Sequence, residues 1–208
     1  MNIWIPAFER SPSDPSAGGA KVLAISGSTR KGSYNSKLLK IAAEMTRQAG
    51  AEVTLLDLEQ YPLPIMNEDL EKEKGVPENA MKLKQLFISH KGLLIASPEY
   101  NSSITALLKN TIDWVSRPVP NEAPLAGFQG KVATLISASP GALGGLRGLV
   151  HLRSILGNIG VIVLPEQVAL TNAHEAFADD GTLKDPKAAA RLKKAMDAFA
   201  AVVRKVHG

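Results

Sequence analysis

The sequence predicts an α/β protein with a doubly wound, five-stranded parallel sheet and helices on both faces. Short apolar runs alternate with amphipathic segments through residues 21–206, with short connections, as in sheets covered on both sides. A turn rich in glycine and hydroxyl groups joins the first apolar run to the first amphipathic segment, where ligands of such sheets bind. The chain has 208 residues, of which 45% are hydrophobic and 21% charged, which is enough for one domain with a sizeable core.

Five runs are expected to be strands. Their residues are almost continuously apolar, which is typical of strands buried on both faces. They are Lys21–Ser26, Glu52–Leu58, Gly92–Ser97, Lys131–Ser137 and Gly160–Leu164.

Five segments between and after these strands are expected to be helices, because their apolar residues recur every three or four positions. In the last of them, Leu192, Met196, Phe199 and Val203 share one face, so we expect them to belong to the core. The predicted helices are Asn35–Gln48, Glu78–His90, Ser103–Val115, Gly145–Asn158 and Pro186–Val206.

Residues 1–19 differ in composition from the rest. They contain Pro6, Pro12 and Pro15, several serines and the pair Gly18-Gly19, which resist regular structure. We therefore predict a flexible N-terminal extension over residues 1–19 and one folded domain over residues 20–208. Every motif described below lies beyond residue 20, so removing the extension is expected to leave ligand binding intact.

Composition excludes several classes of function. The chain has no cysteine, which rules out disulfides, thiolate catalysis and Cys-ligated metals, and its four scattered histidines offer no ligand spacing. No apolar run approaches the ~20 residues of a membrane span, and the N-terminus lacks the pattern of a signal peptide. The net charge of +4 is spread along the chain and aromatics are only 5%, which argues against nucleic-acid binding. We expect a cytoplasmic protein with neither membrane nor nucleic acid as partner.

The segment Gly27–Ser36 predicts an anion pocket. It follows a strand and opens a helix, whose first N–H groups and positive dipole end favour phosphate. Further donors are supplied by the side chains of Ser28, Arg30, Ser33, Asn35 and Ser36. A simpler interpretation is a polar turn in which Ser33 or Asn35 only caps the helix.

Two well-known phosphate motifs do not fit this segment. Gly27 and Gly32 have the spacing of a P-loop, but Ser33-Tyr34 replaces the required Lys followed by Ser or Thr. Gly27-Ser28-Thr29 also breaks the Gly-x-Gly-x-x-Gly pattern of dinucleotide-binding turns. What remains is a pocket for a terminal phosphomonoester, such as that of FMN.

The loop after the third predicted strand contains Pro98, Glu99, Tyr100 and Asn101. Pro98 restricts its own backbone and that of Ser97, so the turn is rigid. Such a turn can hold backbone amides against a planar ring, while Tyr100 and Asn101 add an aromatic face and an amide. On its own, this short motif could equally be an ordinary connection between strand and helix.

Five parallel strands with a single-phosphate loop after the first form the flavodoxin-like pattern, whose strand order is 2-1-3-4-5. Ligands of such sheets lie beyond the carboxyl ends of the strands, where the winding reverses. The loops after the first, third and fourth strands should therefore meet in one site.

With these loops in view, the sequence resembles the NADPH-dependent FMN reductase family, a flavodoxin-like group that includes chromate, quinone and azo-dye reductases. The resemblance covers roughly residues 21–170. It is carried by Gly27-Ser28-Thr29-Arg30-x-Gly-Ser-x-Asn35, by Pro98-Glu99-Tyr100-Asn101 followed by Leu108-Lys109-Asn110-x-x-Asp113-Trp114-x-Ser116-Arg117, and by Ser139-Pro140-Gly141-Ala142-Leu143-Gly144-Gly145. Three segments in the expected order are far more specific than any one of them.

The resemblance implies roles for these residues. The FMN phosphate would be held by Ser28, Arg30, Ser33 and Asn35, with Ser36 beside them, and the isoalloxazine ring would be bordered by Pro98, Glu99, Tyr100 and Asn101. Ser139, Gly141 and Gly144 would form the third side, their loop's glycines allowing close approach to the flavin. Helix packing and subunit contacts would involve Asn110, Asp113, Trp114 and Arg117. No catalytic acid or base and no metal is implied.

The resemblance also implies the reaction. Hydride would pass from NADPH, or NADH, to FMN and then to small acceptors such as quinones, chromate or azo compounds. Two alternatives stay open: a reductase that supplies reduced FMN to a monooxygenase, and a flavodoxin-type electron carrier. The basic, aromatic-poor composition argues against the carrier, because carriers with this fold tend to be acidic and to flank the flavin with aromatics.

Two further expectations concern assembly and the electron donor. A homodimer or homotetramer is implied, and the apolar residues Ile104, Leu107, Leu108 and Ile112 lie in sequence close to the flavin loops. No motif for the adenosine 2′-phosphate of NADPH is recognisable. Charge alone makes candidates of Arg30, Lys109, Arg117 and Arg147.

Overall fold

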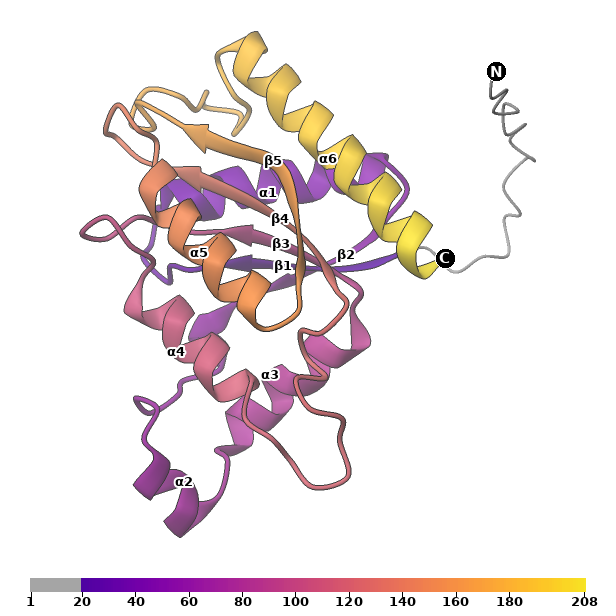
Figure 1. Cartoon of the computed structure of the whole chain (residues 1–208). Helices are drawn as coiled ribbons and strands as arrows, with labels where there is room; N and C mark the ends of the chain where they lie inside the picture. The colour runs from indigo at the N-terminus through magenta and orange to yellow at the C-terminus, as the bar shows by residue number, and fades with distance from the viewer. Residues whose placement is uncertain (1–19) are drawn as a thin grey trace, which may run out of the picture.

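The computed structural model describes residues 20–208, so the extension predicted over residues 1–19 lies outside the described part of the chain. Strands and helices alternate along the chain (Figure 1). The elements are β1 Lys21–Ser26, α1 Tyr34–Gln48, β2 Glu52–Leu56, the 3₁₀ turn η1 Leu58–Gln60, α2 Glu68–Lys74, α3 Glu78–Ser89, β3 Gly92–Ala96, α4 Ala106–Val115, β4 Val132–Ala138, α5 Leu146–Asn158, β5 Ile162–Leu170 and α6 Pro186–His207. Within residues 20–208, no helix combines the length and apolarity that crossing a membrane requires.

The sheet confirms the predicted topology. Its order is β2-β1-β3-β4-β5, and every neighbouring pair is parallel. All five carboxyl ends therefore lie at one edge. Because the chain runs from β1 outward to β2 and then back to β3, the winding reverses beside β1, and the loops after β1 and β3 are neighbours there.

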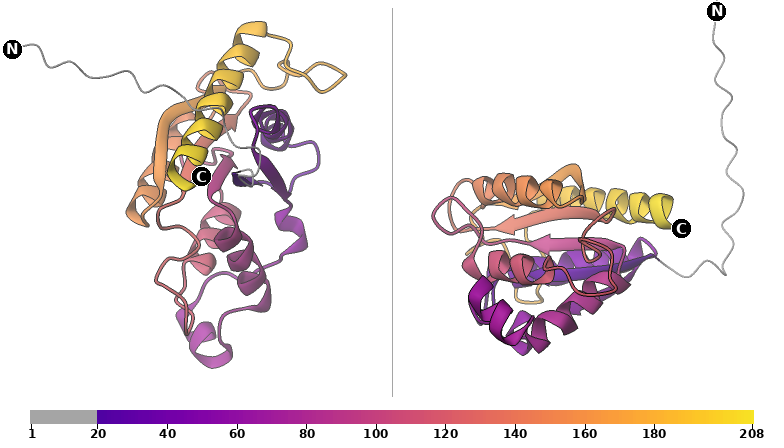
Figure 2. Two further views of the ribbon diagram at one scale, coloured as in Figure 1. Left: turned by 90° about the vertical axis from the view of Figure 1, so that its right-hand side faces the viewer. Right: turned by 60° about the horizontal axis from the view of Figure 1, so that its bottom comes forward.

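Helices cover both faces of the sheet (Figure 2), and side chains that alternate along the strands fill a core on each face. On β1, Val22 and Ala24 pack with α1 and α6, whereas Leu23 and Ile25 pack with α3, α4 and α5. Both cores are built from buried aliphatic and aromatic side chains, and this burial of apolar surface is the main stabilising contribution to the fold.

The apolar side chains that suggested a subunit interface belong to this core. Ile104, Leu108 and Ile112 are buried among the side chains of the α3–α5 side, and Leu107 packs partly against them. This apolar face is therefore satisfied within the chain and gives no reason of its own to expect assembly.

The fifth strand is longer than predicted. The prediction ended it at Leu164, yet β5 continues to Leu170 although Pro165 within it lacks an N–H group. The pairing accommodates the proline through a register shift, since Val163 pairs with Ala133 but Gln167 with Leu135. The edge position of β5 tolerates this irregularity.

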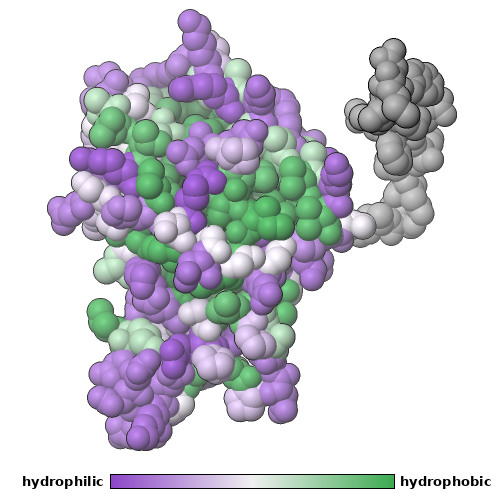
Figure 3. Space-filling model, in the orientation of Figure 1, coloured by the Kyte–Doolittle hydropathy of each residue, from purple (hydrophilic) through white to green (hydrophobic). Residues whose placement is uncertain are grey.

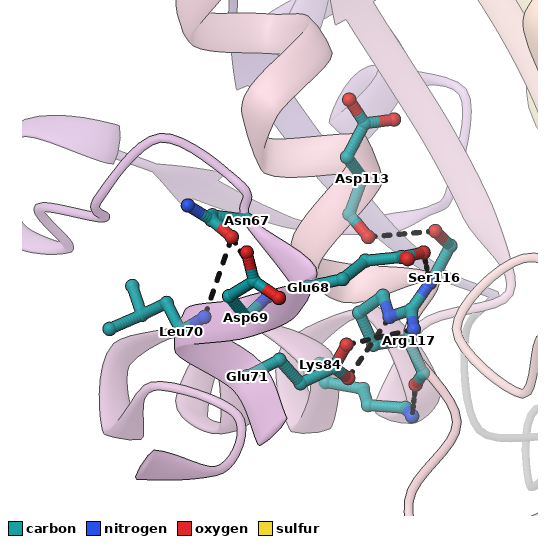
Figure 4. Close-up of polar contacts among 9 residues, drawn as sticks. All are labelled: Asn67, Glu68, Asp69, Leu70, Glu71, Lys84, Asp113, Ser116 and Arg117. Carbon is teal, nitrogen blue, oxygen red and sulfur yellow. Dashed lines mark hydrogen bonds and ion pairs between the residues drawn. The ribbon is translucent and has the colours of Figure 1, made fainter. Parts of the chain in front are cut away.

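Helix α2 is not predicted by the sequence pattern, because none of its residues is buried and it has no apolar periodicity. Its polar, charged surface lies at the bottom of the space-filling view (Figure 3). Arg117 anchors it, with Nη2 2.8 Å from a carboxylate oxygen of Glu71 and Nε donating to the other at 3.0 Å (Figure 4).

Candidate functional site

Loops that follow β1, β3 and β4 meet at the carboxyl edge of the sheet, as predicted. They enclose a hollow of about 140 Å³, here called the first hollow. Its lining comes from all three loops: Ser28, Arg30, Ser33, Tyr34 and Asn35 from the first, Pro98, Glu99 and Tyr100 from the second, and Ala138, Ser139 and Pro140 from the third. Of the residues predicted for the site, Ser36, Asn101, Gly141 and Gly144 do not line this hollow.

The first loop ends in a capped helix start. Ser33 is the N-cap of α1, and its hydroxyl accepts a hydrogen bond from the N–H of Ser36 at 3.4 Å. The N–H groups of Tyr34 and Asn35, also in the first turn, donate to no acceptor within residues 20–208. The capping role foreseen for Ser33 is thus present, and a helix start with unused donors faces the first hollow.

Arg30 supplies the positive charge of this loop. Its guanidinium carbon lies 5.7 Å from the centre of the Tyr34 ring, and Nη1 donates to the carbonyl oxygen of Lys31 at 3.2 Å. Its backbone N–H donates to the hydroxyl of Ser28 at 3.2 Å. In the described part of the chain it has no carboxylate partner, so its charge is available to an anion.

Asn35 is oriented differently from the free donor that the sequence suggested. It is only 4% exposed, and its amide donates to the carbonyl oxygen of Ala138 at 2.9 Å and accepts from the N–H of the same residue at 3.0 Å. This pair of bonds attaches the start of α1 to the end of β4. The amide is therefore engaged within the protein and positions two sides of the first hollow.

The hydroxyl of Ser36 points to the other side of the loop. It lies 2.9 Å from the hydroxyl of Ser26 and donates to the carbonyl oxygen of Ser28 at 3.5 Å. Ser36 thus stabilises the backbone of the first loop on the side opposite the first hollow.

The second loop is a tight turn. Backbone bonds join Tyr100 and Ser103 in both directions, at 2.9 and 3.0 Å. Asn101 and Ser102 both have positive φ, 50° and 66°, as in the turns that join two antiparallel residues. The turn projects the ring of Tyr100, which is 57% exposed, at the mouth of the first hollow.

Glu99 connects this turn to α5. Its carboxylate is 9% exposed, accepts hydrogen bonds from Arg147 at 2.6 and 2.9 Å, and accepts a third from the N–H of Gly148 at 3.1 Å. Burial alone would raise the pKa of Glu99, but the hydrogen bonds from Arg147 and Gly148 and the charge of Arg147 outweigh it, so the pKa lies below its usual value. Glu99 is therefore held as a carboxylate.

The backbone path of the third loop depends on a glycine that packs closely against β5. At Gly144, φ is +61° and an added Cβ would lie 2.9 Å from backbone carbons of Ala169 and Leu170. A Cβ on Gly141 would meet only the hydroxyl of Ser139, at 3.7 Å. The close approach at Gly144 is thus made to β5, while Gly141 stands in open space.

The other matched segment, on α4, holds the chain that precedes α2. The carbonyl oxygen of Pro64 accepts from the amide of Asn110 at 2.9 Å and from the indole of Trp114 at 2.8 Å. Asn110 also accepts from the N–H of Met66 at 2.8 Å. These residues have structural roles, in keeping with the helix packing that was expected of them.

The contacts that join the loops of the site were not predicted, because no local sequence pattern indicates them. The hydroxyl of Thr105 donates to the carbonyl oxygen of Gly27 at 2.7 Å, and Nδ1 of His151 lies 3.0 Å from the hydroxyl of Ser103. Arg147, the partner of Glu99, was considered only for its charge. Each partner lies 48 to 78 positions away in sequence, beyond the reach of motif spacing.

Comparison with known proteins connects this geometry to one family. The sequence profile of the NADPH-dependent FMN reductases matches residues 20–175, which include all three loops. The chain belongs to the NADPH-dependent FMN reductase family. Within residues 20–208, no cluster of three or more acidic, histidine or cysteine side chains could hold a metal ion.

Individual members of the family are similar along most of the chain. An NAD(P)H-dependent FMN reductase of Pseudomonas aeruginosa is 38% identical over 189 residues, 90% of this chain and 97% of its own. An NAD(P)H:quinone oxidoreductase of Solanum tuberosum is 37% identical over 193 residues, again 90% of this chain and 95% of its own. In structure, FerB, a flavoenzyme NAD(P)H:(acceptor) oxidoreductase of Paracoccus denitrificans, gives a TM-score of 0.77 at 32% identity, covering 89% of this chain and 98% of that one.

Proposed function

We propose that this member of the family is an FMN-dependent NAD(P)H oxidoreductase that passes hydride from NADPH, or NADH, to bound FMN and then to quinones, chromate, azo compounds or similar acceptors. The observation that carries the proposal is the first hollow, in which a capped helix start with unused N–H donors, an unpaired Arg30 and a rigid turn come together.

The donor set fits FMN. A phosphomonoester needs N–H and O–H donors and positive charge, which the α1 start, Ser28 and Arg30 supply on one side of the first hollow. No metal or thiolate is needed for that interaction. The flavin, when bound, supplies the redox chemistry.

The role of the protein's own residues is to bind FMN and to orient its ring. In this proposal, Ser28, Arg30 and Ser33 surround the phosphate, with Asn35 and Ser36 holding the backbone of their loop. The turn Pro98–Asn101 and the loop that begins at Ser139 border the ring, and Glu99 fixes the turn to α5. Backbone N–H groups near the ring would stabilise negative charge on it.

Small-molecule acceptors suit this site better than protein partners do. The first hollow is bordered on its outer side by the exposed ring of Tyr100, and no aromatic side chain beyond Tyr34 and Tyr100 lines it. A ring face that is open to solvent would admit small acceptors of varied shape. We place the protein in the cytoplasm, with no membrane or nucleic acid as partner.

A homodimer, or a dimer of dimers, is part of the proposal. Three apolar side chains, Leu143 in the third loop and Leu146 and Val150 at the start of α5, are between 39% and 58% exposed. Light scattering should return twice or four times 22.1 kDa, the mass of one chain. Val150→Glu should shift the protein toward that single-chain mass, and a wild-type protein that stays at 22.1 kDa at micromolar concentration would refute assembly.

Anaerobic reduction tests the proposed reaction. The purified protein should be yellow, keep its colour through desalting, and bleach when NADPH or NADH is added without an acceptor. Loss of FMN on desalting, with activity restored by added FMN, would favour a reductase that supplies reduced flavin. Failure of both nucleotides to bleach the bound flavin would favour an electron carrier.

Steady-state kinetics test whether donor and acceptor share one site. Initial rates against NADPH at several fixed quinone concentrations should give parallel double-reciprocal lines, because both substrates would use the same open side of the ring in alternation. Intersecting lines would indicate that donor and acceptor bind together at separate places.

A further inference from the structure

A second hollow, of about 290 Å³, lies on the other side of the phosphate loop. It is formed by α1, the end of β2 and the turn η1, and it shares Ser28 and Arg30 with the first hollow. Its apolar lining comes from Leu39, Leu55, Leu56 and Leu58. Leu55, on the edge strand β2, is 44% exposed and offers an apolar surface to this hollow. A flat apolar group could cover it.

Charged side chains stand around these leucines. Lys31 and Lys40 line the hollow from the loop and from α1, and Asp57 and Glu59 line it from the segment after β2. None of the four makes an ion pair within residues 20–208. The proposed function assigns the charge of Arg30 to the FMN phosphate, so Lys31 and Lys40 are the cations that remain in this lining for a second phosphate.

Three of the four basic residues considered for the 2′-phosphate of NADPH are paired with carboxylates in the structure. Lys109 is 2.8 Å from Asp113, Arg117 is 2.8 Å from Glu71, and Arg147 is 2.6 Å from Glu99. Each is therefore neutralised by a carboxylate. Arg30 stays unpaired in the described part of the chain, and it borders the second hollow.

The two hollows are suitably separated for the two ends of a dinucleotide. The ring-binding loops follow β3 and β4, whereas the second hollow lies beyond the carboxyl ends of β1 and β2. Two strand spacings, roughly 10 Å, lie between these positions. In doubly wound sheets, ligands bind along this carboxyl edge of the strands.

We propose that the second hollow binds the adenosine end of NADPH, with Lys31 and Lys40 holding the 2′-phosphate. The proposal rests on the proposed use of a nicotinamide nucleotide. The leucines contact the adenine ring, and the carboxylates of Asp57 and Glu59 accept hydrogen bonds from the amino group of adenine and the ribose 3′-hydroxyl. NADPH is then preferred over NADH.

Binding of adenosine 2′,5′-bisphosphate to the FMN-loaded protein tests the site without turnover. Calorimetry should show tighter binding of this probe than of 5′-AMP or inorganic phosphate. Lys31→Gln combined with Lys40→Gln should weaken binding of the bisphosphate about tenfold or more, because two charge-assisted contacts are lost. Equal affinity for the three probes, or an unchanged affinity in the double variant, would overturn the proposal.

Lys37→Gln is the matched control. Lys37 is an exposed lysine of the same helix, but its ammonium lies 5.6 Å from the ring centre of Phe177 and it does not line the second hollow. It should bind the bisphosphate like the wild type. A tenfold loss in this variant too would show that general charge, and not the hollow, attracts the probe.

Kinetics separate donor selectivity from activity. In the double variant, kcat/KM for NADPH should fall about tenfold while kcat/KM for NADH, the FMN content and the flavin spectrum stay unchanged. If the protein oxidised neither nucleotide, the proposed function would fail while the binding experiment still reported on the hollow. An equal fall for both nucleotides would contradict a role in recognising the 2′-phosphate.

Discussion

Asn35 and Ala138 are joined by two hydrogen bonds, of 2.9 and 3.0 Å, that run in opposite directions between a side-chain amide and a backbone peptide. One residue opens α1 and the other ends β4, so the first and third loops of the site are fixed to each other before any ligand arrives. An engaged amide of this kind pre-organises the phosphate loop, which lowers the entropic cost of binding.

Asn35→Ala should therefore damage both the fold and FMN binding. Two buried backbone groups of Ala138 lose their partner, at about 1–3 kcal/mol each, so the free energy of unfolding should fall by about 2–6 kcal/mol. Urea unfolding and fluorescence titration with FMN would measure the two effects. Asn79→Ala, which removes one surface hydrogen bond of 3.0 Å to Pro62, is the control. Equal losses in the two variants would contradict the bridging role.

The sequence was sufficient for the fold because apolar periodicity is a local property. Four strands and most helices were found within a few residues, the fifth strand was found but ended too early, and the strand order followed from the position of the phosphate loop. The partner of Asn35 was not found, because Ala138 is 103 positions away and contributes only backbone atoms. Such bonds depend on which strand ends lie side by side, and no motif encodes them.

Helix starts were predicted less accurately where a turn precedes them. The helix expected from Ser103 begins at Ala106, because Ser103 closes the turn with Tyr100 and Thr105 caps the helix through the N–H of Leu108 at 3.2 Å. Within the site, the partner of Glu99 was likewise not predictable from the sequence. Its motif was recognised, but its side chain faces α5, since only the folded chain brings Arg147 near.

Arg30→Ala should weaken FMN binding about tenfold or more, because one charge-assisted hydrogen bond to phosphate is worth about 1.5–3 kcal/mol. Combining it with Ser28→Ala should weaken binding further. Fluorescence titration of the flavin-free protein provides the measurement. Arg47→Ala, near the C-terminal end of α1 and far from the phosphate loop, should bind FMN normally. An unchanged affinity in the double variant would show that the phosphate lies elsewhere.

Glu99→Gln should destabilise the protein at neutral pH and much less in acid. The folded-state pKa of Glu99 is lowered, so its stabilising contribution is present above the unfolded pKa, near 4.5, and is lost as the pH falls through the folded pKa. At pH 7 we expect a loss of about 1–2 kcal/mol, since Arg147 is largely solvated.

Urea unfolding at several pH values would follow the difference between wild type and Glu99→Gln. The control is Glu78→Gln, which removes an exposed ion pair with Lys82 and should change little at any pH. A difference that stayed constant down to pH 3 would mean that the carboxylate charge is not what holds the turn.

Because Lys131 is buried, the free energy of unfolding should rise with pH in the alkaline range. Its side chain is 4% exposed and donates to the carbonyl oxygen of His90 at 2.5 Å, and burial together with the nearby charge of Lys91 lowers its pKa to about 8. Between pH 8 and about 10.5 the unfolded chain keeps a proton that the folded chain has lost. The free energy of unfolding should then increase by up to about 1.4 kcal/mol per pH unit.

Lys131→Met should flatten this rise, whereas Lys187→Met, at an exposed lysine of α6, should leave it intact. Urea unfolding at pH 7.5, 9 and 10 would compare the three proteins. Parallel curves for all three would show that Lys131 keeps its proton in the folded state.

Gly144→Ala and Gly141→Ala should separate the two reasons for glycine in the third loop. At Gly144, the positive φ of 61° and the contacts of 2.9 Å with the backbone of Ala169 and Leu170 leave no room for a methyl group, so alanine should cost several kcal/mol or displace the loop from β5. At Gly141, the nearest atom would be 3.7 Å away and stability should hardly change.

The FMN affinity of the two glycine variants then tests whether the flavin ring lies close to the third loop. If the ring approaches the loop at Gly141, the alanine variant should bind FMN more weakly while unfolding at the same urea concentration as the wild type. Normal FMN affinity in Gly141→Ala would mean that this glycine is not close to the ring. A Gly144→Ala protein as stable as the wild type would show that the loop can leave β5 without cost, and the third side of the site would then have to be held by Ser139, whose N–H donates to the carbonyl oxygen of Leu170 at 3.0 Å.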